Sequence, residues 1–209
     1  MALSKLAANS FDLTDNYALT GTVTGVTSTQ KLFLIKNLDA SSSSTLSFVD
    51  GSSSVVLDST YKTYLFRFIN MHPSAYEELG FQGSTDSGSN YNTQITSTFF
   101  QASHTEAASA GVSYLTNYDQ ANGTNFQRLN YSTYTDNDSS LCGELFLFNP
   151  SSTTFVKHFI ARTQEHFNNG SSDSYAAGYF NTTSAIDAVQ FKMESGNIDS
   201  GRIALYGIK

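Results

Sequence analysis

The chain has 209 residues, a mass of 22.8 kDa and a formal net charge of −7, which is enough length for one well-buried core. Its eleven basic residues are scattered, which excludes the clustered Lys and Arg that nucleic acids and anionic membranes require. It contains 16 Phe and 12 Tyr, but no Trp and only two Pro. Aromatic and β-branched residues favour strands, whereas the intervening Ser, Asn and Gly favour turns, so this composition predicts an all-β protein.

Residues 1–30 differ from the rest of the chain. They are polar, and their apolar residues are too widely spaced to bury one another: Phe11, Leu13, Tyr17, Leu19, Val23 and Val26. Such a segment predicts an extended arm that needs a partner surface, and these six residues are the candidate attachment residues. A first strand of the domain's own sheet is the alternative interpretation. No apolar run predicts a secretory signal or the roughly 20 apolar residues of a membrane span.

Strand signals recur at short intervals from Lys31 onward. "KLFLIKNL" (31–38) is the first, and "TLSFV" (45–49) and "SVVLD" (54–58) flank Asp50-Gly51, a pair that predicts a tight hairpin. Residues 61–71 predict a strand that the His72-Pro73 pair ends, because proline cannot donate to a ladder. A short helical turn is expected at 74–80, and further strands at 78–83, 91–100, 111–117, 125–134, 143–149, 155–163, 175–181, 185–193 and 202–208.

The spacing of these strands predicts the architecture. Many strands with turn signals every 8–12 residues and no interleaved helices indicate an antiparallel two-sheet β-sandwich. About ten strands over roughly 170 residues suit a jelly roll. We therefore expect residues 31–209 to form a single jelly-roll-like domain that follows an extended N-terminal arm of residues 1–30.

The stretch "STDSGSNYN" (84–92) has three interpretations: a calcium loop, a glycine-rich anion cradle and a hairpin tip. A calcium loop needs acidic oxygens at alternate positions and a final Glu, but Asp86 stands alone. A phosphate cradle opens a helix, whereas a strand is expected to follow here. We therefore predict a hairpin tip in which Asp86 and Asn90 make a tight turn and Gly88 supplies the positive φ.

No set of residues predicts catalysis, a metal site or a cofactor. His158 and His166 would lie about 26 Å apart along one extended strand. His104 lacks the cysteine pair of a zinc deaminase, and the single Cys142 excludes an intramolecular disulfide framework. A glycosidase needs two facing carboxylates, and the sequence pairs none of those nearest the strands, namely Glu77, Glu78, Glu144 and Glu194.

Tyrosines in a polar context are candidate contact residues. Within 113–138 they are surrounded by Asn, Asp, Gln and Thr: Tyr114, Tyr118, Tyr131 and Tyr134. A tyrosine offers a flat apolar face and a hydroxyl, which suits contact with a glycan or a receptor on a wet surface. The alternative is that these rings lie at the rim of the sandwich with their hydroxyls in water.

Three parts of the chain carry distinctive segments: "SKLAANSFDLTDNYALTGTVTG" at the start, "DSTYKTYLFRFINMHPS" with "LGFQGSTDSGSNYNT" in the middle, and "FNTTSAIDAVQFKMESGNIDSGRIALYGIK" at the end. These segments resemble the β-rich virion structural proteins of tailed bacteriophages, particularly marine phages of cyanobacteria and related hosts. The first segment resembles the start of their fibre-like and accessory proteins. The middle segments resemble their Tyr-rich strand, which is followed by an Asn-x-His-Pro break and a Ser-x-Asp-x-Gly hairpin. The last segment resembles their terminal pair of strands. The likeness covers most of the chain, least over 100–140, and supplies no catalytic residues.

The resemblance implies a non-enzymatic virion protein, a capsid decoration or a neck or tail accessory, that is assembled in the host cytoplasm and displayed on the particle. Its partners would be other virion proteins of the capsid, neck or tail, together with its own copies in a homo-oligomer such as a trimer. The acidic charge would keep many copies soluble before assembly, and the lack of disulfides suits a reducing cytoplasm. A glycan- or receptor-binding module of a tail fibre is the alternative.

Overall fold

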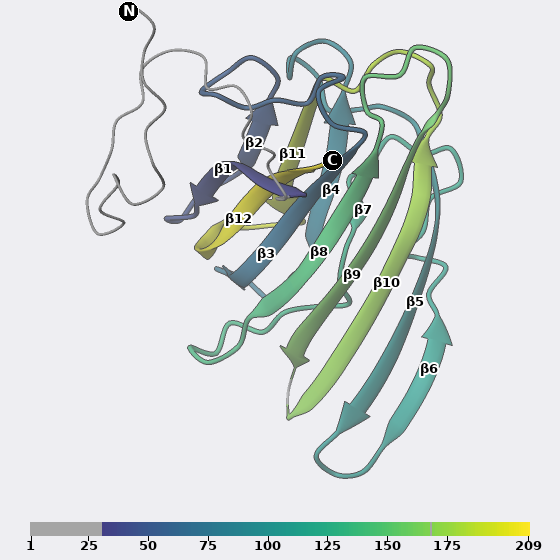
Figure 1. The fold of residues 1–209 in the computed structure, drawn as a ribbon. Helices are drawn as coiled ribbons and strands as arrows, with labels where there is room; N and C mark the ends of the chain where they lie inside the picture. The colour runs from purple at the N-terminus through teal and green to yellow at the C-terminus, as the bar shows by residue number, and fades with distance from the viewer. Residues whose placement is uncertain (1–30, 168) are drawn as a thin grey trace, which may run out of the picture. The chain divides into compact units, whose positions relative to one another are not determined.

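The computed structural model describes residues 31–167 and 169–209 (Figure 1). The arm predicted for residues 1–30, with its six candidate attachment residues, lies outside the described residues. Within them, all regular structure is antiparallel strand, and the twelve strands form two sheets with no helix. The predicted all-β, two-sheet antiparallel sandwich is therefore confirmed.

The two sheets differ in width. The smaller sheet has four strands, in the order β2 (Leu46–Val49), β11 (Ala188–Met193), β4 (Leu79–Ser84) and β7 (Gln127–Arg128). The larger sheet has eight, in the order β1 (Leu32–Asp39), β12 (Ile198–Ile208), β3 (Thr63–Pro73), β8 (Leu141–Phe148), β9 (Lys157–Phe167), β10 (Gly170–Phe180), β5 (Ile95–Thr105) and β6 (Ala110–Tyr114).

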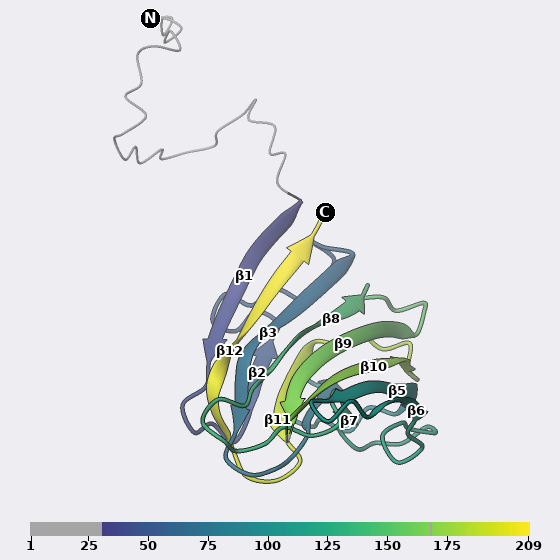
Figure 2. The ribbon, with the colours of Figure 1, turned by 90° about the horizontal axis from the view of Figure 1, so that it is seen from below.

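Eight of the twelve strands form a jelly roll. Strands β1-β12-β3-β8 face β2-β11-β4-β7, and the chain crosses between the sheets from β1 to β2, from β2 to β3 and from β3 to β4. Two four-stranded sheets connected in this way are the double Greek key of a jelly roll. Strands β9, β10, β5 and β6 continue the larger sheet beyond β8, as Figures 1 and 2 show, and we call these four strands the sheet extension.

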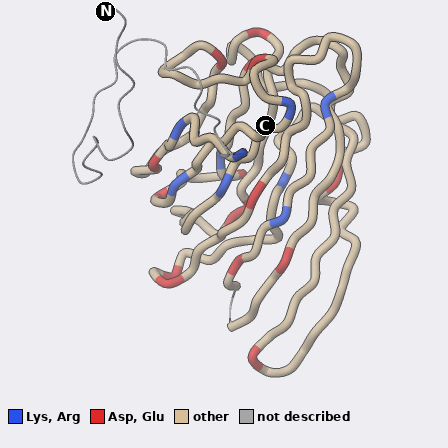
Figure 3. The backbone as a smooth tube through the Cα atoms, in the orientation of Figure 1, with Lys and Arg blue, Asp and Glu red and all other residues tan. Residues whose placement is uncertain are grey.

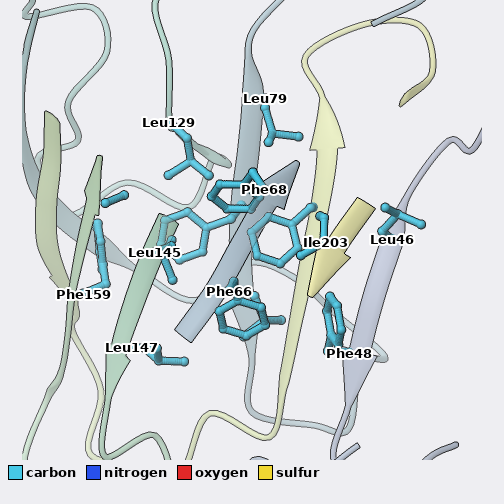
Figure 4. Close-up of a cluster of buried hydrophobic side chains, with 14 of the residues drawn as sticks. Leu46, Phe48, Phe66, Phe68, Leu79, Leu129, Leu145, Leu147, Phe159 and Ile203 are labelled. Atoms are coloured by element: carbon cyan, nitrogen blue, oxygen red, sulfur yellow. The ribbon is translucent and has the colours of Figure 1, made fainter. Parts of the chain in front are cut away.

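The core lies between the two sheets and is rich in phenylalanine (Figure 4). Phe66 and Phe68 point inward from β3, because alternate side chains of a strand face opposite sides of the sheet. Phe191 of β11 lies opposite them, and its ring centroid is 5.2 Å from that of Phe66 and 5.4 Å from that of Phe68. Phe48 and Phe81 of the smaller sheet also contact Phe191, at 6.2 and 6.3 Å.

The prediction of a hairpin at Asp50-Gly51 is wrong. Gly51 does adopt a positive φ of 73°, and the turn is closed by a hydrogen bond from its N–H to the carbonyl of Val55. However, residues 54–58 form no strand, and β2 pairs with β11 instead. Val55 and Leu57 are buried as loop residues, so their apolar pattern reflects core packing without a ladder.

The prediction of a hairpin at 84–92 is wrong as well, although the predicted roles of Asp86, Asn90 and Gly88 in the turn are confirmed. Strand β4 belongs to the smaller sheet and β5 to the larger, so this segment is a crossover between sheets. Asp86 organises it by accepting hydrogen bonds from the backbone N–H and side-chain amide of Asn90 and from the hydroxyl of Ser84. These hydrogen bonds lower the pKa of Asp86 to about 2, and the bond from the Asn90 side chain has the largest effect. Gly88 has the expected positive φ of 80°.

Two further expectations fail in the described residues. The segment 125–134 contains only the two-residue strand β7, because most of its length crosses the inner side of the sheet extension as a loop. No helical turn forms at 74–80; Glu77 instead makes an isolated bridge with Thr133.

Replacing Phe191 by Ala should lower the free energy of unfolding by about 3–5 kcal/mol, since the change removes a fully buried ring that contacts both sheets. Urea titration followed by circular dichroism measures the difference. Phe155→Ala is the matched control, because that ring is 69% exposed in a loop, and it should change stability by less than about 0.5 kcal/mol. Equal effects of the two changes would contradict the assignment of Phe191 as the centre of the core.

Candidate functional site

The outer face of the larger sheet, the face turned away from the smaller sheet, carries most of the exposed apolar side chains. Six of the eight exposed large hydrophobic residues of the described chain lie in strands of this sheet. The remaining two, Tyr76 and Phe155, lie in connections. Those on the sheet are Leu34, Ile69, Phe100, Val112, Tyr114 and Ile160.

Cross-strand register places a row of stacked side chains in the sheet extension. Arg162 of β9 is opposite Tyr175 of β10, which is opposite Phe100 of β5. The rings of Tyr175 and Phe100 are nearly parallel, with centroids 4.7 Å apart, and the Arg162 guanidinium carbon lies 5.3 Å from the Tyr175 centroid. Cation–π and aromatic contacts of this kind hold the row upright on the sheet.

Asp173 holds two members of this row, Arg162 and Tyr175, in place. It accepts hydrogen bonds from Nε and Nη2 of Arg162, at 3.0 and 2.6 Å, and from the hydroxyl of Tyr175 at 2.9 Å. The Arg162 hydrogen bond lowers the pKa of Asp173, so this carboxylate stays charged. A bidentate Arg–carboxylate pair has a defined geometry, and the site therefore presents ordered donors and acceptors.

Two shallow hollows flank the row. One, of about 200 Å³, is apolar and is lined by Thr98, Phe100, Ile160, Tyr175 and the alanines between them. The other, of about 350 Å³, is polar, and its two Arg and two acidic residues cancel in formal charge. Such a surface suits a neutral ligand with one apolar and one hydroxylated side. The side chains of the polar hollow include Arg67, Cys142, Glu144, Arg162, Gln164 and Asp173.

The four candidate tyrosines do not form one surface. Tyr114 alone lies on the outer face, where its ring is 53% exposed and its hydroxyl donates to Asp119. Tyr118 lies in the connection between β6 and β7, Tyr131 lies in the connection between β7 and β8, and the two rings stack with centroids 5.7 Å apart. Tyr134 packs edge-on against Tyr76, with ring centroids 4.5 Å apart. The structure thus keeps Tyr114 as a contact candidate and assigns Tyr118 and Tyr131 to packing.

A small polar cavity of about 100 Å³ lies beside Tyr118 and Arg128. Arg128 lies between two carboxylates, with Nε 3.9 Å from Glu78 and Nη2 3.8 Å from Glu194. Tyr118 donates to Glu78 at 2.9 Å, and burial raises the pKa of this carboxyl. The sequence left these two carboxylates unpaired; the structure joins them through an arginine, which makes the cluster a charge network between loops and strands.

The histidines are dispersed among the described strands. His104 and His166 both lie opposite Ser171, in the strands that flank β10, and His166 Nδ1 is 3.0 Å from the Ser139 hydroxyl. His158 lies beside Tyr179. Across 31–167 and 169–209, no group of three or more His, Cys, Asp or Glu side chains is arranged to hold a metal ion. The same part of the chain contains no helix that could cross a membrane.

The inner side of the sheet extension holds a buried carboxyl that sequence reasoning missed. Glu165 is fully buried, and its Oε1 accepts a hydrogen bond from the backbone N–H of Tyr131 at 3.1 Å. Its Oε2 and the hydroxyls of the buried Ser172 and Ser174 make no hydrogen bond in the described chain. Burial raises the pKa of Glu165 from 4.5 to about 8, so the neutral form is stable inside the protein.

No family model, curated protein or solved structure matches this chain. The geometry of the outer face is therefore the basis for inferring a function. The row of stacked side chains could not be predicted from any one segment of the sequence, because Phe100, Arg162 and Tyr175 come from three strands and become neighbours only through the strand register. The alternation of apolar residues in 155–163 and 91–100 was the one available hint.

Glu165 predicts a pH dependence of stability. Because the pKa of Glu165 is higher in the folded than in the unfolded chain, its contribution to the free energy of unfolding is fully present below pH 4.5. This contribution is lost as the pH rises to about 8. Glu165→Gln should remove this loss and flatten the slope of unfolding free energy against pH by up to about 1.4 kcal/mol per unit within that window. Urea titrations between pH 5 and 8.5 measure it. Glu106→Gln, at an exposed turn, should leave the slope unchanged, and an unchanged slope in Glu165→Gln would refute the buried neutral carboxyl.

Proposed function

We propose that this chain is a non-enzymatic structural protein of a tailed-phage virion, displayed on the particle as a capsid decoration or as a neck or tail accessory. It is assembled in the host cytoplasm and is attached to capsid, neck or tail proteins through residues 1–30. The attachment residues are Phe11, Leu13, Tyr17, Leu19, Val23 and Val26. The resemblance of its segments to such proteins supports this setting.

The observation that carries the proposal is the set of apolar side chains exposed on the outer face of the larger sheet, four of which, Phe100, Val112, Tyr114 and Ile160, lie in the sheet extension. Soluble monomers rarely leave large contiguous apolar patches in water, and such patches mark interaction surfaces. Here six large apolar side chains are exposed in one sheet, and two of them, Phe100 and Ile160, line the same hollow. A protein that works in an assembly covers this kind of surface with its neighbours, including other copies of itself.

Charge distribution supports the same conclusion. Strands β5 and β6 contain no Lys, Arg, Asp or Glu, so the charged residues within the strands of the sheet extension, coloured in Figure 3, all lie in β9 and β10. Depletion of charge and enrichment of aromatic residues are the compositional signature of the centre of a protein interface. The net charge of −7 keeps separate copies apart and soluble until assembly.

In the phage that encodes the chain, a variant lacking residues 1–30 should be synthesised but should be missing from purified particles. Mass spectrometry of gradient-purified virions measures its copy number against the capsid protein. Two point variants make the test more specific: Leu13→Ser with Leu19→Ser should reduce incorporation several-fold, whereas Thr14→Ser with Thr20→Ser should not.

Two results would contradict the proposal at different levels. Unchanged incorporation of the truncated chain would remove the attachment role of the arm and leave the virion role intact. Absence of the full chain from purified particles would exclude the virion role itself.

A glycan- or receptor-binding module of a tail fibre is the second candidate, and the stacked row favours it. Aromatic rings beside a fixed Arg–carboxylate pair can hold a sugar, since its C–H face packs on the ring and its hydroxyls reach the charged groups. The neutral polar hollow beside the apolar one supplies both surfaces. This places the contact at Phe100, Tyr114 and Tyr175, and only Tyr114 belongs to the tyrosines selected from sequence.

Glycan-array binding tests the second candidate. The full chain should bind a host surface glycan, and Phe100→Ala with Tyr114→Ala should weaken that binding at least about tenfold, because it removes about 1–2 kcal/mol of ring contact. Phe155→Ala is the control, since it deletes an exposed ring that lies away from the sheet. No binding of the full chain, or equal binding by both variants, would eliminate the glycan role.

A further inference from the structure

Strand β6 is the outermost strand of the larger sheet and pairs only with β5 in the described chain (Figure 1). All five of its residues are exposed, and it is the one described strand with no buried or half-buried side chain. Val112 at its centre is 75% exposed. A strand that buries so little surface against one neighbour is weakly held, so a second neighbour at its free edge would stabilise it.

The backbone of β6 is oriented to accept another strand. The N–H of Leu115 donates to the carbonyl of Phe99, and the N–H of Thr105 donates to that of Ser109, so these directly opposite pairs are the hydrogen-bonded ones. Hydrogen-bonded and non-hydrogen-bonded pairs alternate along an antiparallel ladder. The N–H and C=O groups of Ala110, Val112 and Tyr114 therefore point away from β5, toward solvent.

The other described sheet edges carry features that discourage pairing, whereas β6, although only five residues long, has neither a charge nor an irregularity. Edge strands are normally blunted by charge, by bulges or by shortness. Strand β1 contains Lys36 and Asp39 and has a register shift between Leu34 and Lys36. Strand β2 has four residues with alternating burial, and β7 has only two. Strand β6, "AGVSY", has no charge, no proline and no register shift.

We propose that two copies of this chain pair antiparallel through β6, with the two-fold axis at Val112. In this register Val112 lies opposite Val112 of the second copy, and Ala110 lies opposite its Tyr114. The three residues whose backbone groups face outward then form the hydrogen-bonded pairs between the copies. The two larger sheets become one continuous sheet of sixteen strands.

The composition of β6 selects a second copy as the partner. An isologous interface places each residue against its own symmetry mate or another residue of the same patch, so any charge near the axis would face itself. Strands β5 and β6 have none. The pairing sets a small side chain, Ala110, against a large one, Tyr114, and it joins the apolar outer faces of both copies. The inference does not depend on the virion role, because it follows from this edge alone.

Sedimentation equilibrium of the full 209-residue chain tests the proposal. The wild type should be in a concentration-dependent monomer–dimer equilibrium that strengthens with salt, since salt screens the repulsion between two copies of charge −7. Val112→Lys and Val112→Glu should each weaken the dimer by roughly tenfold or more, because each places like charges opposite one another at the axis. Circular dichroism should show unchanged folding, since the side chain is mostly in solvent.

Mixing the two charged variants gives the decisive result. An equimolar mixture of Val112→Lys and Val112→Glu should recover a dimer that contains one copy of each, because opposite charges then meet at the axis. Val112→Thr is the matched control and should dimerise like the wild type, since it keeps the branched shape and the backbone donor.

Three results would overturn the proposal. The first is a wild-type chain that stays monomeric at every concentration. The second is a trimer, or any assembly that both charged variants form as well as the wild type. The third is association that survives the charged variants but is lost when residues 1–30 are deleted, which would identify those residues as the occupant of a different surface.

Discussion

The contact of Phe191 with both sheets is the interaction on which the rest of the structure depends. The sheets form separate ladders, so side-chain packing is what holds them face to face. Phe191 in the smaller sheet contacts Phe66 and Phe68 in the larger one, and Phe48 and Phe81 complete the cluster from its own side. The chain crosses between the sheets several times around this cluster. Each crossover is therefore tied to a well-packed centre, and aromatic side chains fill the layer without the need for a disulfide.

The unequal width of the sheets sets the second constraint. Four strands cannot cover eight, so the connection between β7 and β8 covers part of the inner side of the sheet extension. A connection offers backbone groups as well as side chains, and the strands meet them with polar residues: Thr163 donates to the carbonyl of Leu129, and Glu165 accepts from the N–H of Tyr131. The buried carboxyl and serines of this region are the consequence. Its interior is polar because its cover is largely a loop.

Local chemistry was predictable from the sequence, whereas strand partners were not. Turn formers at Gly51 and Gly88 adopt the expected positive φ, and most predicted strands exist near their expected places. The Asp50-Gly51 hairpin fails because residues 54–58 pack as a loop, and the 84–92 hairpin fails because a turn signal says that the chain reverses but not which sheet it enters. The stacked row was hidden for the same reason, since Phe100 and Tyr175 are neighbours only through the pairing of β5 with β10. The four tyrosines between 113 and 138 were grouped by proximity in sequence, and the fold separates them.

The polarity of the sheet extension is reversed relative to an ordinary sandwich. Toward its far end, the buried inner side carries Thr163, Glu165, Ser172 and Ser174, while the outer side carries exposed Phe100, Val112 and Tyr114. Folding of a single copy gains little from such an arrangement, because it buries polar groups and leaves rings in water. Strand β6 has both exposed apolar side chains and an uncharged free edge. The proposed pairing would account for both together, since one neighbour at β6 would pair the free backbone and extend the apolar face.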